Sequence, residues 1–250
     1  MALIYKPAFR RGGFTFKQFF VGHDKCAMKV GTDGVLLGAW APVYNRNRCL
    51  DIGCGSGLIA LMIAQRTEEH TVIDAVELDV FAAMQAVDNV QQSPWPSRIT
   101  VYQQDIHELV RQHVQQNNPQ YDLIVSNPPY FEPAIACRNE ARNQARYTES
   151  LTHQGLLACV RELIKPTGLF CVVLPYGIGK QFEKMAVNLG WFTHVRVNIR
   201  DRSDKPLHRL LLGLSLQEQE TQVSELTIRA LDGAYSDEFR QLVTDFYLYY

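Results

Sequence analysis

The sequence predicts an α/β protein with a doubly wound, mostly parallel sheet of seven strands that ends in an antiparallel hairpin. From residue 48 to 216, short apolar runs rich in β-branched residues alternate with segments of helical periodicity. A glycine-rich segment follows the first of these runs, as in many nucleotide-binding sheets. The last two runs are joined only by residues 201–206, which is too short for a parallel crossover and predicts the hairpin.

Each element can be placed along the chain. Strands are expected at 48–51, 72–76, 99–102, 121–126, 169–174, 192–198 and 209–216. Helices are expected between them at 57–65, 80–92, 106–116, 151–163 and 177–189.

The two ends of the chain extend this pattern. Residues 31–41 predict a helix that Thr32 or Asp33 caps and Pro42 ends. Residues 1–30 then form an N-terminal extension to a single domain over 31–250. Residues 226–250 predict a short strand and an amphipathic helix whose apolar side chains cover the core.

Composition excludes several classes of protein. With 250 residues, of which 46% are hydrophobic, the chain can bury the core of one domain. Its apolar runs are too short to cross a bilayer and no signal peptide opens it, so we expect a cytoplasmic protein. The six cysteines form no CxxC pair and the seven histidines no HExxH motif, so we expect reduced thiols and no metal.

A glycine-rich segment provides the clearest chemical signal. Asp51, Gly53, Gly55 and Gly57 form a DxGxGxG pattern between the first strand and a helix, where missing Cβ atoms let a ligand approach the backbone. A pyrophosphate site would use GxGxxG, and an aspartate two residues ahead would repel the phosphates. The ammonium group of S-adenosylmethionine suits Asp51 better. Taken alone, the glycines are equally consistent with a tight turn.

Two further acids follow the next two strands. Glu77 ends the second strand, where a carboxylate can accept both ribose hydroxyls of a nucleoside. Asp105 follows the third strand and could accept from the cofactor's adenine amine, with Ile106 beside the ring. Each acid alone could equally cap a helix or lie in solvent. Their shared place at strand ends favours a nucleoside-like cofactor.

The fourth strand is followed by Asn127, Pro128, Pro129 and Tyr130. Prolines remove amide donors, so this turn presents acceptors to a ligand. The Asn127 side-chain oxygen and the Pro128 carbonyl can each accept one hydrogen from a planar NH2 group, and Tyr130 can stack on the ring that carries it. An ordinary rigid turn is the alternative.

The combination of DxGxGxG with NPPY resembles the amino-methyltransferase branch of the class I S-adenosylmethionine-dependent methyltransferases. That branch includes adenine N6-methyltransferases and the glutamine methyltransferases of release factors. Further segments make the chain similar over nearly its full length to the bacterial tRNA1(Val) (adenine(37)-N6)-methyltransferase family, namely residues 14–20, 29–40, 145–147 and 245–248.

This resemblance implies methylation of N6 of adenosine 37, beside the anticodon of a valine tRNA, with S-adenosylmethionine as cofactor. The target adenosine lies in a single-stranded loop, so its base can be turned out of the loop into a pocket of the enzyme. It places Thr32 and Asp33 near the methionyl part of the cofactor and residues 127–130 around the target base.

Docking of tRNA is harder to locate, because the net charge is only −1. Arg138, Arg142 and Arg146 share one face if helical, and Lys205 and Arg209 flank the expected hairpin turn. Each set could equally be a solvated charged face. Lys17 lies among aromatic residues that could contact bases or, alternatively, pack on the core.

Two other functions remain open. N5-glutamine methylation of a protein such as a release factor would use the same chemistry, although about 30 residues before the first helix leave no room for the usual recognition domain. A non-catalytic RNA-binding module on a methyltransferase fold is the other.

Overall fold

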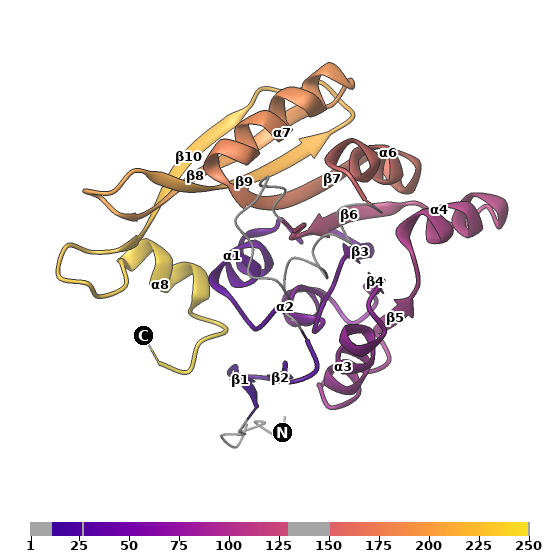
Figure 1. Ribbon diagram of the computed structural model, residues 1–250, viewed down its shortest axis with the longest axis horizontal. Helices are drawn as coiled ribbons and strands as arrows, with labels where there is room; N and C mark the ends of the chain where they lie inside the picture. The colour runs from indigo at the N-terminus through magenta and orange to yellow at the C-terminus, as the bar shows by residue number, and fades with distance from the viewer. Residues whose placement is uncertain (1–11, 27, 130–150, 250) are drawn as a thin grey trace, which may run out of the picture.

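The computed structural model describes residues 12–26, 28–129 and 151–249. Within these ranges one eight-stranded sheet runs in the order β10-β8-β9-β7-β6-β3-β4-β5 (Figure 1). Its strands are β3 (Arg48–Ile52), β4 (Val72–Glu77), β5 (Ile99–Gln103), β6 (Tyr121–Ser126), β7 (Ile164–Pro175), β8 (Phe192–Arg202), β9 (Leu207–Ser215) and β10 (Gln222–Arg229). The predicted doubly wound sheet is confirmed.

Among the described strands of this sheet, only β9 runs antiparallel to its neighbours, pairing with β8 in the predicted hairpin and with β7 on its other side. The eighth strand was not expected in the sheet. It is β10, which lies parallel to β8 and forms the sheet edge. Leu226 and Ile228 of β10 are buried, whereas its first four residues, from 222 to 225, are all exposed and show no alternation, so the strand begins four residues before the expected start.

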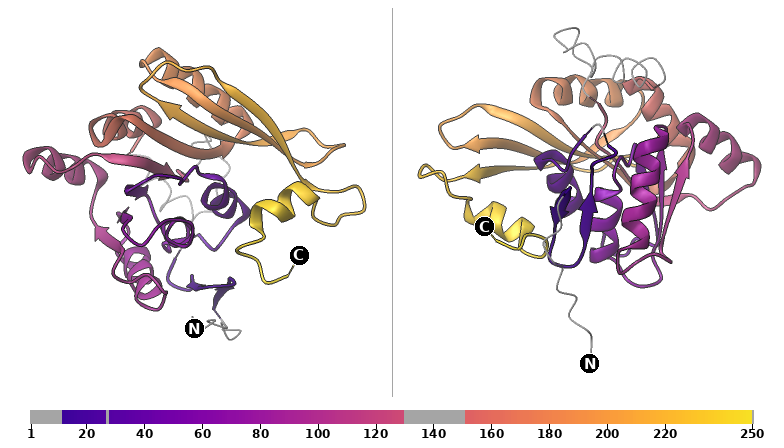
Figure 2. Two further views of the ribbon diagram at one scale, coloured as in Figure 1. Left: turned by 180° about the vertical axis from the view of Figure 1, so that it is seen from behind. Right: turned by 60° about the horizontal axis from the view of Figure 1, so that its bottom comes forward.

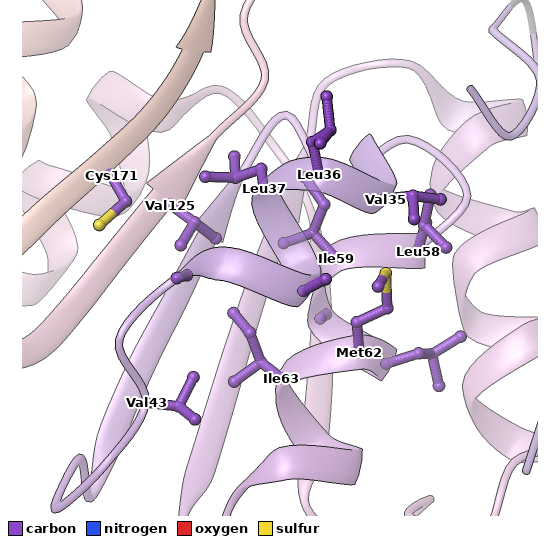
Figure 3. Close-up of a cluster of buried hydrophobic side chains, with 14 of the residues drawn as sticks. Val35, Leu36, Leu37, Val43, Leu58, Ile59, Met62, Ile63, Val125 and Cys171 are labelled. Carbon is purple, nitrogen blue, oxygen red and sulfur yellow. The ribbon is translucent and has the colours of Figure 1, made fainter. Parts of the chain in front are cut away.

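Helices cover both faces of the sheet (Figures 1 and 2). One hydrophobic cluster includes residues of α1 (Thr32–Trp40), α2 (Leu58–Arg66), α3 (Val80–Gln91) and α8 (Asp237–Val243). The other includes residues of α4 (Ile106–Gln115), α6 (His153–Leu163) and α7 (Tyr176–Asn188). Figure 3 shows the first cluster where α1 and α2 meet above β6 and β7. No helix of the described residues is long and apolar enough to span a membrane.

Two local expectations were wrong. Gly31, not Thr32 or Asp33, occupies the N-cap of α1 and makes no side-chain cap bond, and the Asp33 carboxylate binds Arg209. Strand β7 begins at residue 164 rather than 169. The pairing register of β6 and β7 shifts between Tyr121 and Leu123, so the first residues of β7 are paired irregularly with β6.

A small hairpin of β1 (Gly13–Thr15) and β2 (Phe20–Gly22) packs against the same core as the sheet. Phe16 and Phe19 are fully buried and stack with ring centroids 4.6 Å apart. The core-packing alternative for these aromatic residues is therefore confirmed. The ammonium group of Lys17, which lies between them in sequence, donates a hydrogen bond to the backbone oxygen of Thr244 at 2.5 Å.

Candidate active site

The candidate site lies where parallel strands end at the carboxyl edge of the sheet. Ile52, the last residue of β3, is paired with Val76 of β4 on one side and with Ser126 of β6 on the other. The strand order reverses between β3 and β6, which is where ligands of open α/β sheets bind. The register therefore brings the glycine loop (residues 53–57) between Glu77 and Asn127.

The glycine loop needs its glycines for conformation and for space. Gly53, Gly55 and Gly57 have φ values of 70°, 55° and 79°, in the left-handed region that disfavours side chains. The amides of Gly53 and Cys54 donate to the Val76 oxygen at 2.9 and 3.1 Å, which holds the turn against β4. A Cβ atom on Gly53 or Gly55 would meet nothing within 4 Å, so the loop borders open space on this side.

Glu77 fixes the glycine loop from the neighbouring strand. One carboxylate oxygen accepts from the Gly55 amide at 2.8 Å and the other from the Asp79 amide at 2.9 Å. The side chain is buried, and Asp79 rather than Glu77 caps α3. Neither a helix cap nor a solvated acid describes Glu77. Its carboxylate is held in place by the loop that it would serve.

Asp51 is fully buried beneath the glycine loop. Its Oδ2 accepts from the Ala60 amide at 3.1 Å, while Oδ1 makes no hydrogen bond within the described residues. Burial, with a smaller contribution from the charge of Glu77, raises the pKa of this carboxyl to about 7 although the hydrogen bond from the Ala60 amide lowers it. A buried acceptor without a donor is costly, so Asp51 is suited to a cationic or hydrogen-bonding ligand.

Asn127 shows the same feature on the other side of the strand reversal. Its Oδ1 is buried and has no donor among the described residues. The preceding residue is fixed, because the Ser126 hydroxyl donates to the Ile52 oxygen at 2.9 Å and links the ends of β6 and β3. Pro128 is buried and Pro129 is half-buried, and Tyr130 lies outside the described residues.

Asp105 and Ile106 are placed by the start of α4. Asp105 is the N-cap of this helix, with its Oδ1 accepting from the His107 amide at 2.7 Å and lying 2.8 Å from His107 Nδ1. Asp105 therefore caps a helix, which was the alternative to cofactor binding for this residue. Ile106 is buried in the second hydrophobic cluster. Contact of either residue with a cofactor stays a prediction.

Thr32 and Asp33 form the first turn of α1, close to the start of α2. A Cβ atom on Gly34 would lie 3.0 Å from Leu58 Cδ2, and Leu58 directly follows the glycine loop. Figure 3 shows Val35 and Leu58 side by side at this contact. Tight packing of the two helices therefore brings the first turn of α1 beside the glycine loop.

The candidate RNA contacts are spread over separate elements. Arg138, Arg142 and Arg146 lie outside the described residues. Lys17 is engaged with Thr244, and Arg209 with Asp33. Lys205 is exposed in the β8–β9 turn, where its amide donates to the Arg202 oxygen at 3.0 Å.

One supporting residue was missed by sequence reasoning. Asn89 of α3 is buried and its side chain bonds the amide and oxygen of Gly22, at 2.9 and 2.8 Å, and the oxygen of Ser56 at 2.8 Å. The signal was present, because Asn89 lies on the apolar face of α3 with Ala82, Ala86 and Val90. A polar residue on such a face needs partners.

These features fit S-adenosylmethionine. Open space beside Gly53 and Gly55 accommodates a ligand against the backbone. The unpaired oxygen of Asp51 suits the ammonium group, and that of Asn127 suits an amine substrate. The donors and acceptors therefore match a cationic nucleoside cofactor beside an amine.

Comparisons with known proteins identify the family of the chain. The family model described as "Methyltransferase small domain" matches residues 30–174. The chain is 69% identical to a "tRNA1(Val) (adenine(37)-N6)-methyltransferase" of Photorhabdus laumondii, over 98% of this chain and 99% of that one. Proteins of the same name in Serratia proteamaculans and Yersinia enterocolitica are 62% and 59% identical, over 96% and 98% of this chain and 92% and 96% of theirs.

Among solved structures, the chain is similar to a predicted O-methyltransferase of Agrobacterium tumefaciens, with a TM-score of 0.64 and 16% identity. The match covers 86% of this chain and 96% of that one. At this identity the likeness supports the fold, a class I methyltransferase sheet, and not the substrate.

Proposed function

The chain belongs to the tRNA1(Val) (adenine(37)-N6)-methyltransferase family, and on this premise we propose that it transfers a methyl group from S-adenosylmethionine to N6 of adenosine 37 in tRNA1(Val). The observation that carries the proposal is the pair of buried acceptors, on Asp51 and Asn127, that have no donor among the residues the structure describes. They stand on either side of the strand reversal, one suited to the cofactor and one to the amine.

Asn127 would orient the target amine. Its Oδ1 accepts one N6 hydrogen and the Pro128 carbonyl accepts the other, so the nitrogen lone pair is directed away from the turn. Bound S-adenosylmethionine supplies the methyl group as a sulfonium, which must be attacked in line with the departing sulfur. As N6 forms its new bond it becomes cationic, and the acceptor dipoles of Asn127 and Pro128 stabilise that charge before a proton leaves to solvent.

Tyr130 and the proline pair complete the base pocket in this proposal. Pro129 offers no amide donor, which keeps the turn an acceptor surface. Stacking of Tyr130 on adenine would contribute about 1 to 3 kcal/mol. The tRNA loop must present the base unstacked, and a single-stranded position makes this inexpensive.

The remaining residues would hold the cofactor and the RNA. We assign the ammonium group to Asp51, the ribose hydroxyls to Glu77 and the adenine to Asp105 and Ile106. Thr32 and Asp33 would border the methionyl part. Among the RNA candidates, the exposed position of Lys205 supports a phosphate contact, while Arg138, Arg142 and Arg146 stay predictions.

The test is incubation of the purified protein with S-adenosylmethionine and unmodified tRNA1(Val), followed by nuclease digestion and mass spectrometry of the nucleosides. We expect N6-methyladenosine, located at position 37 by sequencing of the digest. A transcript with guanosine at position 37 is the matched control and should remain unmethylated. Methylation of the control, or none of either RNA, would contradict the proposed target.

The two other functions predict different results. A glutamine methyltransferase would label a release factor and leave both transcripts unmodified. A non-catalytic module would bind tRNA but show no affinity for the cofactor. Calorimetry with S-adenosylmethionine measures this affinity directly.

A further inference from the structure

Arg209 and Asp33 form an ion pair between residues 176 positions apart. The Arg209 Nε lies 2.8 Å from Asp33 Oδ1 and 2.9 Å from Oδ2, and its Nη1 donates to the His208 oxygen at 3.0 Å. The two side chains are only 26% and 18% exposed. A partly buried, charge-assisted contact of this kind holds both side chains in one geometry.

Arg209 stands at the carboxyl edge of the sheet. It is paired with Pro175, the last residue of β7, and with Ile199 of β8. Since β7 is the parallel neighbour of β6, Arg209 lies two strands from β6, the strand that Asn127 follows. The β8–β9 hairpin continues past this point to the turn that carries Lys205. Arg209 is therefore at the base of a hairpin that projects beyond the site edge.

Asp33 stands on the other side of the same edge. It belongs to the first turn of α1, which lacks a side-chain cap and packs on the start of α2 directly after the glycine loop. Because Leu58 packs directly against Gly34, the two helices cannot move closer together at this point. A displacement of the Asp33 turn would therefore press on the loop that borders the cofactor space.

We propose that Arg209 is a positioning residue for the cofactor side of the active site, acting through Asp33 on the first turn of α1. This inference rests on the proposed function, because it assumes that the space beside the glycine loop holds the cofactor. It replaces the sequence-based expectation that Arg209 binds tRNA phosphate. The Asp33 carboxylate offsets the charge of the guanidinium and fixes its direction, so Arg209 suits a phosphate less well than an arginine without an acidic partner would.

The test compares Arg209→Ala with Arg202→Ala. Arg202 is a matched control, because it lies on the same hairpin and binds an acid, Asp204, at 2.9 and 2.8 Å, but that partner is two residues away and not on α1. Affinity for S-adenosylhomocysteine is measured by calorimetry, and tRNA affinity over a salt series. KM for each substrate and kcat follow from methylation assays.

For Arg209→Ala we expect binding of S-adenosylhomocysteine about tenfold weaker and KM for S-adenosylmethionine raised to match, as when one charge-assisted partner is lost. The tRNA affinity and its salt slope should stay within twofold of wild type. Arg202→Ala should change neither. If Arg209→Ala instead weakens tRNA binding and lowers the salt slope by about one, Arg209 is a phosphate contact and the inference is overturned.

Arg209→Lys guards against a folding defect in the alanine variant. It keeps the charge and can still pair with Asp33, so a native melting curve with cofactor affinity above that of Arg209→Ala supports positioning. A natively folded lysine variant that binds the cofactor no better than Arg209→Ala overturns it. Wild-type protein that binds S-adenosylhomocysteine but methylates no tRNA would contradict the proposed substrate alone. Wild-type protein that binds no cofactor would overturn both.

Discussion

Asn89 donates a hydrogen bond from its side-chain nitrogen to the backbone oxygen of Ser56, at 2.8 Å, in the middle of the glycine loop. The same side chain holds Gly22 of β2 through its amide and its oxygen. One buried amide thus joins the N-terminal hairpin, α3 and the cofactor loop. The loop is braced from outside the sheet as well as from Glu77 within it.

Replacing Asn89 by Ala should release this brace. Three backbone groups lose their partner, and we expect the free energy of unfolding to fall by at least ~2 kcal/mol, with weaker binding of S-adenosylhomocysteine. Urea unfolding and calorimetry measure the two effects. Asp88→Ala is the control, because Asp88 lies on the same helix and pairs with Lys25 at 2.8 Å, away from the glycine loop. Equal loss of cofactor affinity in both variants would argue against the brace.

Asn127→Ala should separate chemistry from cofactor binding. The variant removes an acceptor that the target amine uses as it becomes cationic, so we expect kcat to fall by about 10² to 10³, the size seen for one preorganised polar contact. Binding of S-adenosylhomocysteine should stay within about threefold by calorimetry. Asn118→Ala, at an exposed position, serves as control. An active Asn127→Ala enzyme would contradict the proposed role.

Asp51 should make the stability of the cofactor-free protein depend on pH. Because burial raises its pKa to about 7, the native state holds a proton that the unfolded chain releases near its ordinary value of 3.8. Between these values stability falls as pH rises, by at most ~1.4 kcal/mol per pH unit, and it levels above 7. Thermal melts from pH 4 to 8 on wild type and Asp51→Asn should differ by this slope.

Cofactor affinity should change with pH in the opposite direction. A cationic ammonium group favours ionised Asp51, so binding releases a proton below pH 7 and tightens as pH rises toward that value, by up to ~tenfold per unit. Calorimetry in buffers of different ionisation enthalpy counts the proton. In Asp51→Asn the affinity should be lower and flat with pH. A wild-type affinity that weakens as pH rises from 5 to 7 would contradict this role.

Gly53→Ala tests whether the open space at the glycine loop belongs to the cofactor. Gly53 has a φ of 70° and Gly233 a φ of 90°, and a Cβ on either meets nothing within 4 Å of the protein. Both alanine variants should therefore lose about 1 to 2 kcal/mol of stability from backbone strain. Only Gly53→Ala should weaken cofactor binding, by more than about tenfold. Equal cofactor affinity in the two variants would place the ligand elsewhere.

Much of this arrangement was predictable because its signals are local. The alternation of apolar runs and helical segments located the strands from 48 to 216, and the short 201–206 connection identified the antiparallel hairpin. Strand ends carry the site, so the positions of Asp51, Glu77 and Asn127 followed from the strands themselves.

The remainder depends on contacts that no local pattern contains. The ion pair of Arg209 could not be predicted from sequence, because its partner Asp33 is 176 positions away. The cap of α1 was misplaced as well, since Gly31 occupies it and the Asp33 carboxylate binds Arg209. Irregular pairing of β6 with β7 hid the first residues of β7. Tertiary partners, rather than propensity, decide these features.

The packing of the β1–β2 hairpin sets an order of events during protein synthesis. The side chain of Lys17 donates to the backbone oxygen of Thr244 and its amide to that of Phe246. The ring centroids of Phe14 and Tyr247 are 5.6 Å apart. At 5 to 20 residues per second, a ribosome needs roughly 10 to 45 seconds to add the 227 residues between Lys17 and Thr244. Until then the hairpin has its contacts with α3 and lacks those with the residues at 244–247. The last bonds of the first-made element therefore form only near the completion of translation.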